Sequence, residues 1–217
     1  MTITYKNVFD KVMVYLKNEG KFFTSSEVKT IINQDAFNRI AEEVKFPKTN
    51  FSSYLASGEW QVSTPANFIC VDPNSQVTYK DGSNTYRVTP KNQVEIGREN
   101  VLTATPGTPE RYFMDNDTLI GIYPPSTSGC IVVPYVHRPT VMSSDTDSNE
   151  LTERCYMAAV YFTVAECFNK DSDERAEKYD SKFWSEINRL KGQYNLMYEI
   201  RRDVFPHRDY VGKMGAR

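Results

Sequence analysis

Residues able to do metal or nucleophilic chemistry are few and widely spaced in this sequence. None of the four cysteines forms a C-x-x-C pair, and the histidines are His137 and His207. The cysteines are Cys70, Cys130, Cys155 and Cys167. Zinc needs several thiolates or imidazoles brought together by close spacing. The pattern therefore predicts no metal site, and it favours buried free thiols in a reducing compartment.

A D-x-D motif at Asp115, Asn116 and Asp117 is the nearest approach to a calcium loop. Such a loop needs Gly at its sixth position and Glu at its twelfth, and this segment has neither. Asp and Asn also form turns by bonding their own backbone. We interpret this motif as a turn between two short strands.

Catalytic motifs are equally scarce. The sequence contains no glycine-rich phosphate loop and no G-x-S-x-G elbow. His137 lies at the end of a predicted strand, where a half-exposed structural role is the simpler explanation. Carboxylate pairs such as Glu42 and Glu43 fall on predicted helix faces, where they are usually solvated. We therefore predict no enzyme activity, no catalytic residue and no cofactor.

The N-terminal segments have helical periodicity. Residues 4–17 place apolar side chains on one face. Thr24 and Glu27 form a capping box that begins a second helix, and apolar residues at spacing four continue it to Val44. Pro47 disfavours helical geometry at the residue before it, so this helix should end there.

From about residue 54 to 139 the pattern is that of short strands. Residues 77–88 alternate around Asp81-Gly82, which predicts a hairpin. Pro134 interrupts the run 131–136 and predicts an edge strand or a bulge. We expect Gly129 to allow the sharp reversal into that strand.

Helical patterns return after an acidic linker at residues 143–150. Residues 151–168 are apolar nearly all round, and residues 173–195 are amphipathic. The expected fold class is α+β, with a helical bundle built from N- and C-terminal helices, an inserted antiparallel β region of short hairpins and an extended C-terminal tail. The expected domains are 1–53 with 140–195 (helical), 54–139 (β) and 196–217 (tail).

The charge balance argues against a protein that grips nucleic acid. Net charge is −2 and the pI is near 5.8, whereas phosphate binding needs clustered Lys and Arg. Neither a signal-peptide core nor an 18-residue apolar run is present. We expect synthesis in the cytoplasm and no membrane partner.

The C-terminal residues 189–217 differ from the rest of the chain. Seven basic residues stand against three acidic ones, which gives this segment +4. Apolar and aromatic residues are scattered among the charges without a period. A segment of this kind orders on a partner, or it folds back on its own domain. The anchors of interest are Arg201, Arg202, Phe205, Arg208 and Tyr210.

Three segments, in order, resemble the head-to-tail connector (portal adaptor) proteins of tailed bacteriophages. The first is VSTPANFI (62–69) before the hairpin. The second is TPGTPERY (105–112) with LIGIYPP (119–125) and the Gly129 turn. The third is VPYVHRP (133–139), followed by the linker and the two last helices.

The resemblance implies a structural virion protein at the head–tail interface. It implies a homo-oligomeric ring, usually of twelve copies, beneath the portal protein, with tail (nozzle or tube) proteins below and double-stranded DNA passing through a channel. The tail of each subunit would bind the portal. The β part would lie between neighbouring subunits, with the expected contact residues Tyr112, Tyr123, Pro124, Pro125 and Tyr135.

Two other functions stay open at this point. One is a tail-associated cell-wall hydrolase or carbohydrate-binding component, which would need an acidic residue in an aromatic cleft. The other is a standalone cytoplasmic binding domain that is monomeric and indifferent to portal.

Overall fold

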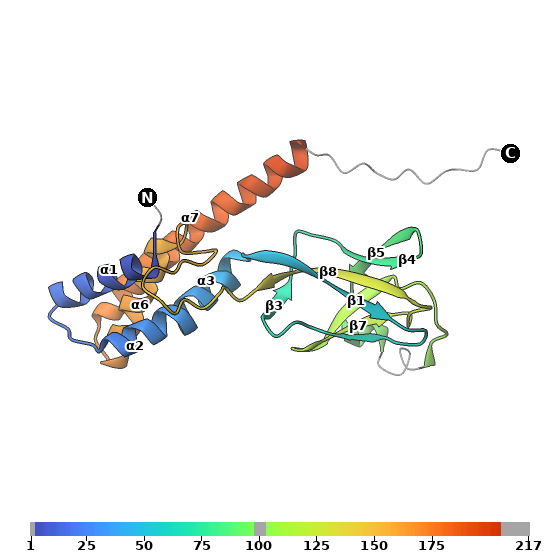
Figure 1. Ribbon diagram of the computed structural model, residues 1–217, viewed down its shortest axis with the longest axis horizontal. Helices are drawn as coiled ribbons and strands as arrows, with labels where there is room; N and C mark the ends of the chain where they lie inside the picture. The colour runs from blue at the N-terminus through green and yellow to red at the C-terminus, as the bar shows by residue number, and fades with distance from the viewer. Residues whose placement is uncertain (1–2, 98–102, 205–217) are drawn as a thin grey trace.

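The computed structural model describes residues 3–97 and 103–204. The subunit is elongated, with helices gathered at one end and strands at the other (Figure 1). The last helix, α7, runs out of the helical end along the side of the molecule. No helix among the described residues is both long enough and apolar enough to cross a bilayer.

The N-terminal helices follow the predicted pattern with one addition. Helix α1 (Tyr5–Asn18) buries Tyr5, Val8, Val12 and Leu16, as its periodicity predicts. Thr24 caps α2 (Ser25–Thr30) through the expected capping box with Glu27. The helix then continues as a π-helical stretch, η1 (Ile31–Ala36), before α3 (Phe37–Val44). Sequence periodicity does not reveal this π stretch, which is rare and often lies near functional positions.

The C-terminal helices complete the helical core. Helix α6 (Tyr156–Lys170) begins later than the apolar pattern predicts, although Leu151 and Cys155 before it are also buried. Helix α7 (Arg175–Val204) buries its predicted stripe as far as Leu190. These buried residues are Ala176, Tyr179, Phe183, Ile187 and Leu190. The side chain of Tyr194, the last residue of the predicted stripe, lies outside the described residues. Helices α1, α2, η1, α3, α6 and α7 share one apolar core.

The β part is an eight-stranded sheet with its own core. Seven strands follow the order β1-β8-β4-β5-β6-β7-β2, and β3 also pairs with β8. The bounds are β1 Lys48–Leu55, β2 Gln61–Ser63, β3 Phe68–Val71, β4 Val77–Asp81, β5 Asn84–Pro90, β6 Arg111–Asn116, β7 Leu119–Tyr123 and β8 Gly129–His137. A short helix, α4 (Gln93–Ile96), follows β5. The pairing of β4 with β5 confirms the predicted hairpin.

The expected fold class, a helical bundle with an inserted β region of short hairpins, was wrong. The β part is one eight-stranded sheet that curves toward a barrel and buries its own cluster of side chains. Local alternation in the sequence predicted the β4–β5 hairpin. It did not predict the long-range pairings, such as that of Lys48 in β1 with Val136 in β8. Whether the proposed domain boundaries mark independently stable units stays a prediction.

Strand β8 is central, so the expectation of an edge strand at Pro134 was also wrong. Pro134 lies opposite Asn50 of β1, at a position whose backbone groups point away from β1. On the side of β8 that faces away from β1, β3 pairs with residues 135–137 of β8 and β4 pairs with residues 130–132. The proline nitrogen therefore falls between two partner strands and removes no hydrogen bond from the ladder.

The reversal before β8 is made by Ser128 and not by Gly129. Ser128 has φ 135°, while Gly129 is outside the positive-φ region. Gly129 is required for a different reason, because an added Cβ would lie 2.5 Å from the carbonyl oxygen of Lys80.

Candidate functional site

A cleft of about 800 Å³ opens in the β part on the side of β3 and β6. Its apolar lining comes from Phe68, Ile69, Tyr112 and Met114. A polar rim surrounds these side chains and consists of Thr64, Asn116, Asp117, Thr118, Arg138 and, from α3, Glu42. An apolar centre with a polar rim is the usual anatomy of a protein–protein contact.

The cleft is suited to binding and not to acid–base chemistry. Burial raises the pKa of the Tyr112 hydroxyl and of the Cys70 thiol, so both stay neutral near pH 7. Glu42 and Asp117 are exposed, whereas a glycosidase acid needs an apolar setting. In the part of the chain that the structure describes, no group of three His, Cys, Asp or Glu side chains could hold a metal ion.

The D-x-D motif ends a strand and begins a turn: Asp115 and Asn116 are the last residues of β6, and the turn starts at Asp117. The Oδ1 atom of Asn116 accepts from the backbone nitrogen of Thr118 at 2.8 Å. Asp115 accepts from Nε2 of Gln61 at 2.6 Å. The Asn116 bond stabilises the turn of the β6–β7 hairpin, which closes one end of the cleft, and the Gln61 bond ties β2 to β6.

The expected β contact residues occupy different environments. Tyr112 lines the cleft, and Tyr123 and Pro124 are half-buried. Pro125 is buried, and Tyr135 is only 5% exposed. The Tyr135 ring stacks on Phe68, and its hydroxyl donates to Asn67 at 3.1 Å. The role of these residues between subunits stays a prediction.

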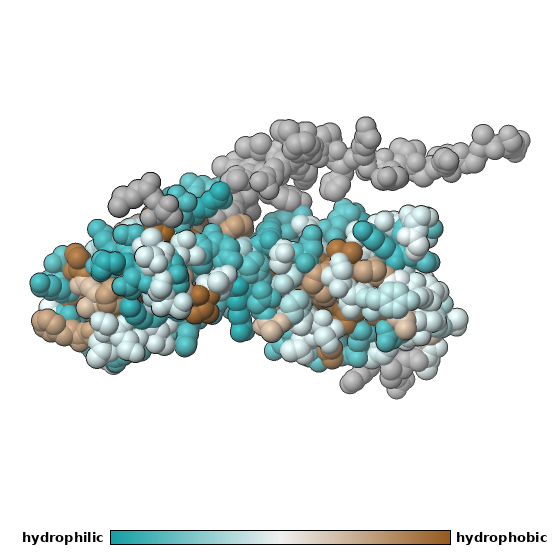
Figure 2. All heavy atoms as spheres, viewed as in Figure 1, coloured by the Kyte–Doolittle hydropathy of each residue, from teal (hydrophilic) through white to brown (hydrophobic). Residues whose placement is uncertain are grey.

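Large exposed apolar side chains are spread over both ends of the subunit. Phe22 in the α1–α2 loop is 88% exposed, Val94 on α4 is 86% exposed, and Tyr54 on β1 is 69% exposed. Figure 2 shows separate apolar patches over both parts of the visible face. Contacts with other proteins could therefore be made at both ends.

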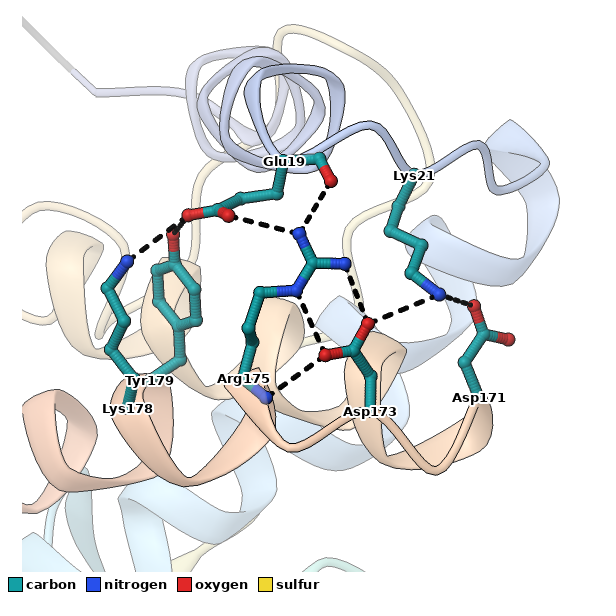
Figure 3. Close-up of polar contacts among 7 residues, drawn as sticks. All are labelled: Glu19, Lys21, Asp171, Asp173, Arg175, Lys178 and Tyr179. Atoms are coloured by element: carbon teal, nitrogen blue, oxygen red, sulfur yellow. Dashed lines mark hydrogen bonds and ion pairs between the residues drawn. The ribbon is translucent and has the colours of Figure 1, made fainter.

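A charged cluster that the sequence did not predict holds the α1–α2 loop against the α6–α7 turn (Figure 3). Arg175 donates to Asp173 through Nη2 at 2.7 Å and to the Glu19 carboxylate through Nη1 at 3.1 Å. Lys21 lies between Asp171 and Asp173, at 2.8 and 3.3 Å. The acidic run 171–174 was the available signal, but its partners lie about 150 positions earlier in the chain.

Electrostatics keep this cluster ionised. The hydroxyl of Tyr179, Lys178 and Arg175 all lower the pKa of Glu19. Hydrogen bonds from Arg175 lower the pKa of Asp173. The cluster therefore fixes the base of the loop that exposes Phe22.

The family model of the SU10 adaptor protein matches residues 3–204 of the chain. The chain belongs to the SU10 adaptor protein family. This is a family of phage head–tail adaptors, so the chain is a structural component of a phage virion that contacts other head–tail components. A search of curated proteins found no match.

Of the residues expected to bind a portal, few can be placed on this adaptor. Arg201 and Arg202 belong to the backbone of α7, and their side chains lie outside the described residues. Phe205, Arg208 and Tyr210 lie outside them altogether. Their role stays a prediction.

Proposed function

We propose that this adaptor forms a twelve-fold ring beneath the portal protein and links the capsid to the tail (nozzle or tube) proteins. DNA passes through the ring's channel during packaging and ejection. Membership of the adaptor family over residues 3–204 is the observation that carries this proposal.

Helix α7 supports a role for the C-terminal extension in portal binding. Its 30 residues correspond to about 45 Å. The described part of its buried stripe runs to Leu190, and the helix continues to Val204. Arg201 and Arg202 follow later in the same helix, and in this proposal they contact the portal.

The net charge supports passage of DNA without tight binding. The 26 basic residues are outnumbered by 28 acidic ones, so the subunit as a whole carries no excess of positive charge for phosphate. Several basic residues of the helical part are held by acids, as Lys21, Arg175 and Lys191 are. A channel of this composition would let DNA slide.

Electron microscopy of the purified protein mixed with portal tests the proposal. We expect rings seated on the narrow face of the portal, and a monomer indifferent to portal would overturn it. A variant lacking residues 196–217 keeps the described buried residues of α7, from Ala176 to Leu190, so it should fold and should no longer co-sediment with portal. Arg189→Ala, which removes a cation within the retained helix, is the matched control and should still bind.

A further inference from the structure

Strand β1 is the outermost strand of the sheet. It pairs along its eight residues with β8, and among the described strands none pairs with its other side. An outer strand of this length presents a row of backbone donors and acceptors to another chain.

The register identifies which backbone groups are open. The His137 amide donates to the Pro47 carbonyl oxygen at 3.1 Å, and residues 48–55 pair in sequence with 136–129. Because bonded pairs alternate in an antiparallel ladder, the backbone groups of Thr49, Phe51 and Ser53 face β8. Those of Asn50, Ser52 and Tyr54 face outward. These three outward residues are all exposed.

The edge lacks the devices that usually block pairing. Natural edge strands carry proline, bulges or free charges. β1 has no proline and no register shift, and Asn50 and Ser52 are uncharged. The one cation, Lys48, is held 2.7 Å from the buried carboxylate of Asp72. By contrast, β2 at the far edge is three residues long.

A complementary edge lies on the other flank of β8. Residues Tyr135 and Val136 pair with β1 and with β3, so these two strands lie on opposite sides of β8. β8 is the only described strand that pairs with β3, and Phe68, Ile69 and Cys70 line the cleft. One subunit thus carries a free strand on one flank and a cleft bordered by a strand on the other. Contacts between unlike flanks are what close a ring of identical copies.

We propose that β1 is an assembly strand whose outer edge pairs with the β3 edge of a second copy of this chain. Tyr54 is 69% exposed at the end of β1, and its hydroxyl contacts Ser128 of its own subunit at 2.5 Å. On assembly it exchanges that contact for the neighbour's cleft, against Tyr112 and Met114. β1 and the neighbour's β3 run parallel. Within one subunit both strands are antiparallel to β8, and the rotation between neighbouring subunits of a twelve-fold ring changes the direction of a strand only slightly. This inference rests on the ring proposed above and assigns the joint between its subunits.

Amide hydrogen exchange in the wild-type protein tests the joint directly. In the isolated subunit, the amides of Asn50, Ser52 and Tyr54 should exchange fast, and those of Phe51 and Ser53 slowly. In the ring, the three outward amides should become at least ten-fold slower, while the inward amides serve as the internal reference. Unchanged exchange at the outward amides in a formed ring overturns the proposal.

Proline substitution supplies an independent test with a matched neighbour. Ser52→Pro removes an outward amide and leaves the pairing with β8 intact, so the variant should fold and fail to form rings. Ser53→Pro removes an inward amide and should lower the unfolding midpoint. If Ser52→Pro fails to fold, Met114→Arg serves instead, because Met114 is 40% exposed at the cleft and tolerates a long side chain.

The outcomes separate the two proposals. A wild-type protein that forms no ring contradicts the proposed function. Rings of normal yield from folded Ser52→Pro and from Met114→Arg contradict the assembly strand alone and leave the adaptor ring in place.

Discussion

Arg175, the first residue of α7, donates through Nη1 to the main-chain oxygen of Glu19 at 2.6 Å, just after α1 ends. The same atom lies 3.1 Å from the Glu19 carboxylate. The two residues are separated by 156 positions, so this contact forms only when the N- and C-terminal helices have packed (Figure 3). This contact links α1 to α7, the first and last helices of the helical core.

Removal of the cation should lower stability in a pH-dependent way. Arg175 and its neighbours lower the pKa of Glu19 and of Asp173, so the folded state binds fewer protons than the unfolded state. The stabilisation is complete above the unfolded pKa values, about 4, and is lost as the pH falls through the lower folded values. The thermal midpoint of Arg175→Met should therefore lie below that of wild type at pH 7, with the gap shrinking below about pH 4.

Arg189→Met is the control for this prediction. Arg189 pairs at 2.7 Å with Glu186 of the same helix, three residues away, and half of its side chain is exposed. Its loss should change the midpoint little at any pH. A gap for Arg175→Met that is as large at pH 3 as at pH 7 would show that lost packing, and not charge, explains the effect.

Asn33 in the π-helical stretch should anchor the linker before α6. Its Nδ2 donates to the Met142 carbonyl oxygen at 2.8 Å, and its Oδ1 accepts from the Met142 amide at 3.2 Å. Because these bonds satisfy both backbone groups of Met142, Asn33→Ala should cost about 1–3 kcal/mol in urea unfolding. Amide exchange in residues 140–147 should become faster.

Asn38→Ala is the comparison, since the Asn38 side chain bonds to the Gln34 carbonyl oxygen of its own helix at 2.7 Å. We expect a loss within about 0.5 kcal/mol and no change in the linker. Equal losses for the two variants would mean that the linker is held by other contacts.

Local patterns in the sequence predicted those parts of the fold that local physics determines. The face of α1, the Thr24 cap, the β4–β5 hairpin and the stripe of α7 all depend on residues within a few positions of one another. The order of the strands in the sheet depends instead on residues far apart in the sequence. β8 pairs with β1, β3 and β4, which lie about 50 to 90 residues earlier in the chain, and no periodicity indicates which strand will be its neighbour.

The cleft was beyond prediction for a related reason. Its walls come from α3, the segment 64–71, the segment 112–118 and Arg138. Taken alone, each segment has the sequence pattern of an ordinary turn or strand. The residue types that line the cleft are those of any half-buried surface. Tyr112 was expected at a contact because of the family resemblance. Phe68 lies in the VSTPANFI segment of that resemblance but was assigned no contact, and Met114 had no signal of its own.

Substitution by alanine should destabilise the protein at one glycine and stabilise it at another. A Cβ at Gly129 would lie 2.5 Å from the Lys80 carbonyl oxygen and 2.5 Å from the Tyr79 hydroxyl, which is fully buried and bonded to Ser126 at 2.7 Å. Gly129→Ala must displace backbone or break that bond, so it should cost about 1–3 kcal/mol. Gly192 lies in α7, where an added Cβ would meet no atom within 4 Å apart from the adjacent backbone of its own helix, and alanine favours the helix by about 0.5–1 kcal/mol. Chemical unfolding of both variants beside wild type measures the two shifts, and a Gly129→Ala protein as stable as wild type would contradict the close approach of β4 to β8.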